Sequence, residues 1–218
     1  MGLFGWLFGK QQRVATRDFI WLTDAARMNG VARSIDSHLA ASRPVLVLAQ
    51  FPSTLAAFGE HLIKPERPHA AIPSTVSPRA AVELATAGPR VLFGLVRNLK
   101  PDEFPPDENA ASSPLAVVVL ERHFLRDHDE EVVKFAEGLG GSAAVDFHVS
   151  LDDPLMEMFA GAWVAKTLRQ LGMKEHDAID SSMVSRRMRA AQNRIARTTS
   201  TDHEADSPRE WLERNRTG

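Results

Sequence analysis

Short apolar runs alternate with helical patterns through most of this 218-residue chain. Residues 45–49 carry no polar side chain, which is typical of a strand buried on both faces of a parallel sheet. Between such runs apolar residues return at helical spacing, as Met28, Val31 and Ile35 do. Because parallel strands need a crossover connection, the alternation predicts an open, mostly parallel α/β sheet covered by helices on both faces.

The predicted elements divide the chain into parts. Strands are expected at residues 18–22, 45–49, 69–72, 90–96, 115–120 and 145–149, with helices between them. Further helices are expected at about 152–171 and 177–198. We therefore expect an apolar N-terminal segment at 1–16, a lobe at 17–150, a helical extension at 151–198 and a polar flexible tail at 199–218. Periodicity alone fits a RecA-like lobe, a flavodoxin-like sheet and a Rossmann sheet equally well.

Composition excludes several classes of protein. The chain has no cysteine, so it has no disulfide framework, thiolate metal site or cysteine nucleophile, which fits a cytoplasmic location. The net charge of -2 argues against a nucleic-acid partner. No apolar run approaches the ~20 residues needed to cross a bilayer.

The N-terminal segment is apolar but too short to span a membrane. It lacks the charged start and the cleavage site of a signal peptide. A mobile or docked terminus is one interpretation. A weak interfacial anchor is the other, giving peripheral contact with the cytoplasmic membrane. The candidate contact residues are Leu3, Phe4, Trp6, Leu7, Phe8 and Lys10.

A series of motifs in the second half of the chain resembles one known family. The motifs are Glu-Arg-His at 121–123, Ser-Leu-Asp-Asp-Pro-Leu-Met at 150–156, Leu-Gly-Met at 171–173, Ala-Ile-Asp at 178–180 and Ala-Gln at 191–192. In this order they resemble the end of the second motor domain of SecA, the preprotein translocase ATPase, and the start of its helical scaffold. The resemblance is strong over 121–196 and weaker from about 17 to 120. It implies a three-layer RecA-like, P-loop-NTPase-like lobe with a C-terminal helical extension.

The ATPase chemistry of that family is not matched. In register with its Gln-x-x-Gly-Arg-x-Gly-Arg motif, Glu131 replaces the glutamine, and Phe135 and Gly138 replace the two arginines. Such arginines stabilise charge during phosphoryl transfer, and the sequence also has no Gly-x-x-x-x-Gly-Lys-[Ser/Thr] loop. We therefore expect a pseudo-ATPase with no catalytic residue and no cofactor of its own. ATP is expected to bind only where a partner completes the site.

Other polar clusters have simpler interpretations. His123, His128 and Asp129 are metal-ligand types, but a spacing of five does not place two imidazoles on one helical face, so no metal site is expected. Asp127, Asp129, Glu130 and Glu131 are expected to form a solvated acidic face.

The last long helix is basic. Arg186, Arg187, Arg189 and Arg194 form either a solvated face or a surface for an acidic partner. Trp211 lies in a charged tail and is expected at a frayed end.

The leading hypothesis is a non-catalytic, SecA-like protein-interaction module, with Sec machinery or another motor subunit as its protein partner. The alternative is a nucleotide-binding lobe that completes an ATPase site with a partner carrying the Walker loop.

Overall fold

The computed structural model describes residues 14–62, 68–100, 115–139, 143–170, 172–174 and 176–216. The candidate membrane contacts at 3–10, and Leu171 of the Leu-Gly-Met motif, lie outside the described residues. Among the described residues, no helix combines the length and the apolar character that crossing a membrane requires.

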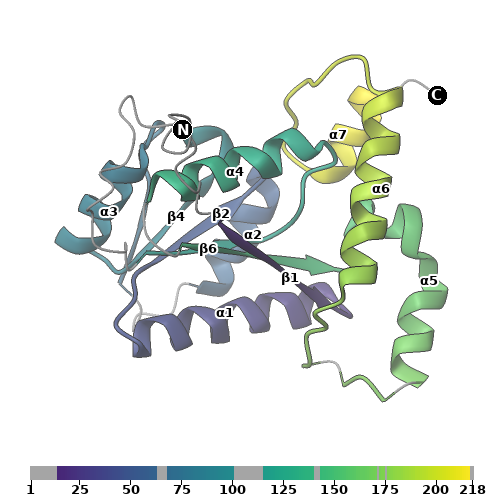
Figure 1. Ribbon diagram of the computed structural model, residues 1–218, viewed down its shortest axis with the longest axis horizontal. Coiled ribbons are helices and arrows are strands. Elements are labelled where there is room, and N and C mark those ends of the chain that lie inside the picture. The colour runs from purple at the N-terminus through teal and green to yellow at the C-terminus, as the bar shows by residue number, and fades with distance from the viewer. Residues whose placement is uncertain are drawn as a thin grey trace, which may run out of the picture.

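All strands of the single sheet are parallel, and they lie in the order β1-β6-β5-β2-β4-β3 (Figure 1). The strands are β1 (Ala15–Trp21), β2 (Val45–Ala49), β3 (His69–Ala71), β4 (Val91–Leu95), β5 (Ala116–Val119) and β6 (Ala144–Ser150). Every residue of β2 and β5 is buried, because both strands are central and covered on each face. The predicted α/β class and its strand positions are confirmed.

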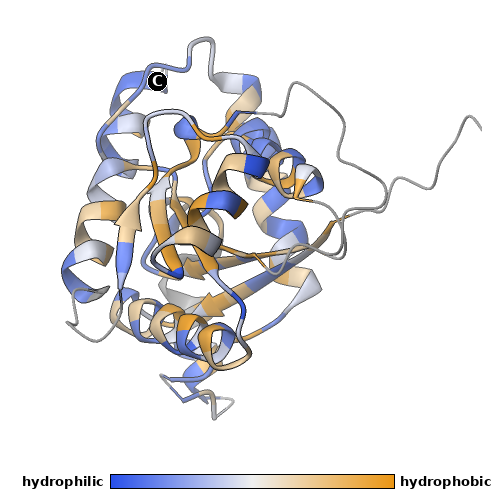
Figure 2. Cartoon of the chain, turned by 90° about the vertical axis from the view of Figure 1, so that its left-hand side faces the viewer, coloured by the Kyte–Doolittle hydropathy of each residue, from blue (hydrophilic) through white to orange (hydrophobic). Residues whose placement is uncertain are grey.

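Helices cover both faces of the sheet. The helices are α1 (Asp24–Ala40), α2 (Pro52–Leu62), α3 (Pro78–Ala87), α4 (Arg126–Gly138), α5 (Pro154–Gln170), α6 (Ser182–Thr198) and α7 (Pro208–Asn215), with a 3-10 turn at Val96–Asn98. α1 and α2 share one apolar core with the sheet through residues such as Val31 and Phe58. α3 and α4 share a second core through Ala81 and Phe135. Figure 2 shows the apolar strands enclosed between these helices.

A third apolar cluster covers the carboxyl ends of the strands. It joins Ile20 and Val149 of the sheet to Met188 and Ile195 of α6. Figure 1 shows α5, α6 and α7 gathered at this end of the sheet. The predicted helical extension is therefore present, although α6 begins at Ser182, later than expected, because Ile179 pairs with Ile20 of β1.

The expected flexible tail is wrong for residues 199–216. Ser207 caps α7 by accepting a hydrogen bond from the Glu210 amide, and Pro208 occupies its first turn. Trp211 is 1% exposed and stacks on Phe124, with ring centroids 4.9 Å apart. A large aromatic side chain with an available apolar surface outweighs the polar character of the rest of the segment.

Gly30 on α1 allows that helix to approach the sheet closely. A Cβ atom placed on Gly30 would lie 2.1 Å from the Trp21 ring. Trp21 in turn stacks on His148 of β6 and donates its indole N–H to His148 Nδ1 at 3.1 Å. The glycine is therefore needed for the ring stack beneath α1.

We expect Gly30→Ala to lower the free energy of unfolding by about 1–3 kcal/mol, because the added methyl group collides with the Trp21 ring. Gly59→Ala on α2 is the matched control, since no atom beyond its chain neighbours and its own helical turn lies within 4 Å of its Cβ position. That control should be neutral, or more stable by up to ~1 kcal/mol from its helix propensity. Urea denaturation of both variants measures the difference, and equal effects would contradict the packing argument.

Candidate functional site

The sheet has a switch point between β5 and β2. From β2 the chain crosses toward β3 on one side, and from β5 it crosses toward β6 on the other. Open α/β sheets bind ligands in the crevice outside the carboxyl ends of such a strand pair. Here that crevice is formed by the segment after β2, at Gln50 and Phe51, and the segment after β5, at residues 121–125.

Glu121 occupies the anion-binding position of this crevice. Its carboxylate accepts hydrogen bonds from the amides of Gln50 and Phe51, each at 3.1 Å, and from the Thr54 hydroxyl at 2.8 Å. Amides at the start of a helix are the groups that hold a phosphate in nucleotide-binding folds. Burial raises the pKa of Glu121 to about 7, and Arg27 nearby opposes the rise. A side chain of the chain itself therefore fills this site.

Asp129 connects the segments around the crevice. It is 2% exposed and accepts from Gln50 Nε2 at 3.1 Å, the His123 amide at 3.1 Å and Arg122 at 3.2 Å. Gln192 of α6 donates to the same carboxylate at 2.7 Å. The prediction of a solvated acidic face is therefore wrong for Asp129, because its place in the first turn of α4 directs it inward.

Arg122 joins the edge strand to the crevice. Its guanidinium donates to Asp18 of β1, with the shorter contact at 2.6 Å, and to Asp129. It also lies 3.4 Å from the centroid of the Phe147 ring on β6. The Glu-Arg-His motif thus has structural roles, since its glutamate binds the start of α2 and its arginine ties β1 to α4.

The C-terminal extension closes the crevice from outside. The Phe51 ring stacks on His123 at 5.3 Å, and Trp211 meets His123 edge-on at 5.2 Å. Gln192 donates to the His123 carbonyl at 2.8 Å, and the Ser53 amide donates to the Asp206 carbonyl at 2.9 Å. The position usual for a ligand is therefore taken by aromatic and amide groups of α6 and α7.

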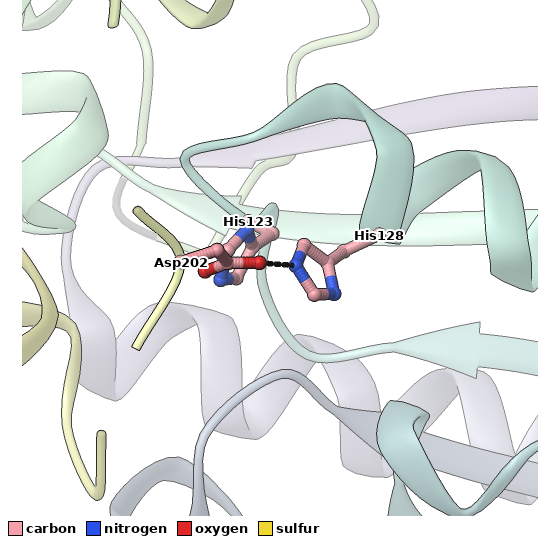
Figure 3. Close-up of side chains that lie close together, drawn as sticks. All are labelled: His123, His128 and Asp202. Atoms are coloured by element: carbon pink, nitrogen blue, oxygen red, sulfur yellow. Dashed lines mark hydrogen bonds and ion pairs between the residues drawn. The ribbon is translucent and has the colours of Figure 1, made fainter. Parts of the chain in front are cut away.

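His123 and His128 lie together with Asp202, a residue that the sequence did not single out (Figure 3). The helical-spacing argument did not apply, because His123 precedes α4 and only His128 lies on it. The imidazole ring centroids are 3.9 Å apart, and His128 Nε2 is 2.6 Å from Asp202 Oδ2. The possible ligand atoms all lie within 4.8 Å of one another.

Hydrogen bonding in this cluster disfavours a metal ion. His123 Nδ1 accepts from the Leu125 amide at 3.0 Å, so a neutral ring carries its proton on Nε2 and has no free lone pair there. Burial, followed by the nearby His128, lowers the pKa of His123 to about 3. Asp202 is already engaged by His128 and by the Trp211 indole N–H at 2.8 Å. The cluster therefore fastens the C-terminal segment to α4.

The residues aligned with the ATPase motif lie on α4 in different environments. Glu131 is exposed, Phe135 is 2% exposed within the core, and Gly138 ends the helix half-buried. The side chain of Phe135 therefore packs under the sheet and does not face the crevice.

The basic residues of α6 lie away from the buried face of the helix. Ser185, Met188, Gln192 and Ile195 form the buried face of this helix. The predicted partner residues Arg186, Arg187, Arg189 and Arg194 are all exposed. α6 itself contains no acidic residue to neutralise them.

A parallel sheet of this topology and its helical cover define the molecule as a three-layer α/β lobe with a C-terminal helical extension. Its sequence is similar to protein translocase subunit SecA of Stenotrophomonas maltophilia (strain R551-3), with 26% identity over 211 residues. SecA of Xanthomonas campestris pv. campestris (strain B100) shows the same identity and length. Each match covers 82% of this chain, which spans 23% of the length of these relatives.

Two solved structures match the chain with low TM-scores. The C-terminal part of the Fun30 ATPase domain matches with a TM-score of 0.41 and 9% identity, over 78% of this chain and 54% of that chain. T4 UvsW matches with a TM-score of 0.42 and 12% identity, over 85% of this chain and 40% of that chain. No family model matches the chain. The predicted resemblance to SecA is confirmed at the level of sequence similarity.

We expect the free energy of unfolding of the protein to depend on whether Glu121 is protonated. The folded state holds this proton to about pH 7, whereas the ordinary pKa is 4.5. Stability contributed by the protonated carboxyl is therefore lost as the pH rises from about 4.5 to about 7. Glu121→Gln keeps a similar set of donors and acceptors without this loss. Between these two pH values, the free energy of unfolding of Glu121→Gln should therefore rise by ~3 kcal/mol relative to that of wild type.

Chemical denaturation of both proteins at stepped pH measures the gain. A difference between them that stays constant with pH would show that Glu121 does not hold its proton in the folded state.

Proposed function

We propose that this protein is a SecA-like lobe that has lost the ATPase motifs and acts as a non-catalytic protein-interaction module connected with preprotein translocation. The proposal combines the sequence similarity to SecA with the contents of the crevice. The relatives are protein translocase subunits by name, and this chain corresponds to only 23% of their length. An accessory role beside a translocase or another motor subunit is proposed from the occupied crevice and from the residues at the ATPase-motif positions.

The observation that carries the proposal is the position of Glu121. The amides of Gln50 and Phe51, directly before α2, lie where a phosphate is held in nucleotide-binding folds, and they bind this carboxylate instead. A phosphate entering here would meet a buried carboxyl group and would have to displace Trp211 and the segment before α7. Both requirements oppose nucleotide binding at the switch point.

The position of Phe135 supports the same proposal. In register with SecA this residue replaces an arginine of the ATPase motif, and its ring belongs to the core beneath the sheet. A buried ring supplies no positive charge to a phosphoryl group, and loss of such an arginine costs orders of magnitude in rate. Glu131 and Gly138, at the other aligned positions, supply none either.

Partner contacts are proposed at the basic face of α6. Exposed arginines with no acidic neighbour on the same helix form a surface for an acidic protein or an anionic membrane. Together with the apolar N-terminal segment, this surface supports a cytoplasmic protein held peripherally at the inner face of the cytoplasmic membrane.

The first test is nucleotide turnover. We expect the purified protein to hydrolyse ATP no faster than buffer, and to add nothing to the rate of a full-length SecA when the two are mixed. A malachite-green phosphate assay measures both rates, and equilibrium dialysis with labelled ATP measures binding. Turnover that appears only in the mixture would favour the alternative, a lobe that completes an ATPase site with a partner carrying the Walker loop.

The second test separates the two membrane contacts. We expect co-sedimentation with phosphatidylglycerol vesicles to fall when residues 2–13 are deleted, because the apolar contacts are lost. It should also fall when Arg186, Arg187, Arg189 and Arg194 are changed to Gln. The matched control changes exposed arginines elsewhere, Arg43, Arg79, Arg90 and Arg209, and so removes the same charge. If the control and the test variants lose vesicle binding equally, net charge alone accounts for the effect of the four α6 substitutions.

A further inference from the structure

The edge strand β1 has outward-facing backbone groups near its start that no described residue pairs. At its carboxyl end, Ile20 pairs outward with Ile179, through hydrogen bonds of 3.0 and 2.9 Å in an antiparallel bridge. Backbone groups alternate in direction along a strand, so those of Thr16 and Asp18 point the same way as those of Ile20. Among the described residues, no backbone hydrogen bond is formed on the outer side of Thr16 or Asp18. Of the two, only Thr16 is exposed, because Asp18 is buried and its carboxylate binds Arg122.

A hollow lies beside this free edge. Its volume is about 430 Å³, and its walls come from the start of β1, from α4 and from α6. Val14 and Thr16 line it from the strand, Lys134 from α4, and Arg189 from α6. Its walls also carry acidic side chains, of which Asp129 pairs with Arg122 and Glu130 with Arg126, while Glu137 is the third. Within the part of the chain that the structure describes, neither Lys134 nor Arg189 forms an ion pair.

We propose that the exposed start of β1, at residues 15–17, and the adjoining hollow bind an extended segment of a partner polypeptide as an added strand, with an acidic side chain of that segment lying between Lys134 and Arg189. The inference rests on the proposed function as a protein-interaction module and assigns its peptide-binding surface. Main-chain hydrogen bonds supply affinity in this kind of recognition, and side-chain hollows supply specificity.

An added strand is the occupant that the geometry favours. The chain already places one residue, Ile179, in strand contact with this edge, and it leaves the edge again at Ser181, which caps α6. The remaining length of β1 continues in the same direction with exposed residues at 15–17. An unpaired N–H and C=O at Thr16 can each take one hydrogen bond from a peptide backbone.

The backbone part of the proposal is tested with Thr16→Pro. The amide of Thr16 faces away from β6, so proline removes an outward donor and leaves the ladder to β6 intact, as edge strands tolerate. Thr16→Val is the matched control, because it keeps the amide. The probe is a fluorescein-labelled peptide of alternating Val and Thr with a central Glu, about eight residues long. We expect Thr16→Pro to weaken its binding by about tenfold in fluorescence anisotropy, and Thr16→Val to leave it unchanged.

The side-chain part is tested by charge exchange. A second peptide, identical except for Lys at the central position, should bind wild type more weakly than the Glu peptide. Arg189→Glu should reverse this preference. Because Arg189 is exposed, the exchange does not depend on how well Thr16→Pro folds, which thermal unfolding checks separately.

Three results would overturn the proposal. These are no binding of the Glu peptide at millimolar concentration, binding unaffected by Thr16→Pro in a folded variant, and a Glu preference that survives Arg189→Glu. Binding that appears only after residues 2–13 are deleted would assign the edge to the N-terminal segment of the chain itself. Neither peptide result depends on ATP, so failure here is separate from failure of the non-catalytic proposal.

Discussion

The carboxylate of Asp129 is the contact on which the arrangement of the molecule depends. It receives hydrogen bonds from the turn after β2, from the turn after β5 and from α6, and Arg122 carries the connection on to β1. Burial raises the pKa of Asp129, while Arg122 and the hydrogen bonds that it accepts oppose the rise. A buried carboxylate with these donors fixes the positions of all of them, because losing any one would leave a polar group unsatisfied in the interior.

Under the proposed function, this network is what would let a SecA-like lobe keep its shape after losing the ATPase motifs. Glu121, Arg122 and Gln192 belong to motifs that resemble SecA, and each takes part in holding the carboxyl edge of the sheet together. The residues aligned with the ATPase motif lie outside this network, on α4. Selection on packing alone can therefore retain the first set and change the second, as the proposed function requires.

The fold was largely predictable, and the site was not. Continuous apolar runs and helical spacing are local patterns, so β2, β5 and α1 follow directly from the sequence. The depth of Asp129 depends on which face of α4 meets the sheet, and three acidic neighbours at 127, 130 and 131 obscure that face. His128 and Asp202 contact each other although they lie far apart in the chain, so a local pattern does not indicate the contact. A single tryptophan in a helix as short as α7 gives too weak a period to distinguish a docked helix from a frayed end.

The stacking of Trp211 on Phe124 also has a consequence for biosynthesis. Every strand of the sheet is synthesised before α7, so the lobe can assemble on the ribosome while the aromatic groups at its carboxyl edge are still uncovered. Until α7 emerges from the exit tunnel, Phe51, His123 and Phe124 lack their outer cover. The nascent chain therefore passes through a stage at which this edge is accessible to chaperones, and the emergence of Trp211 ends it.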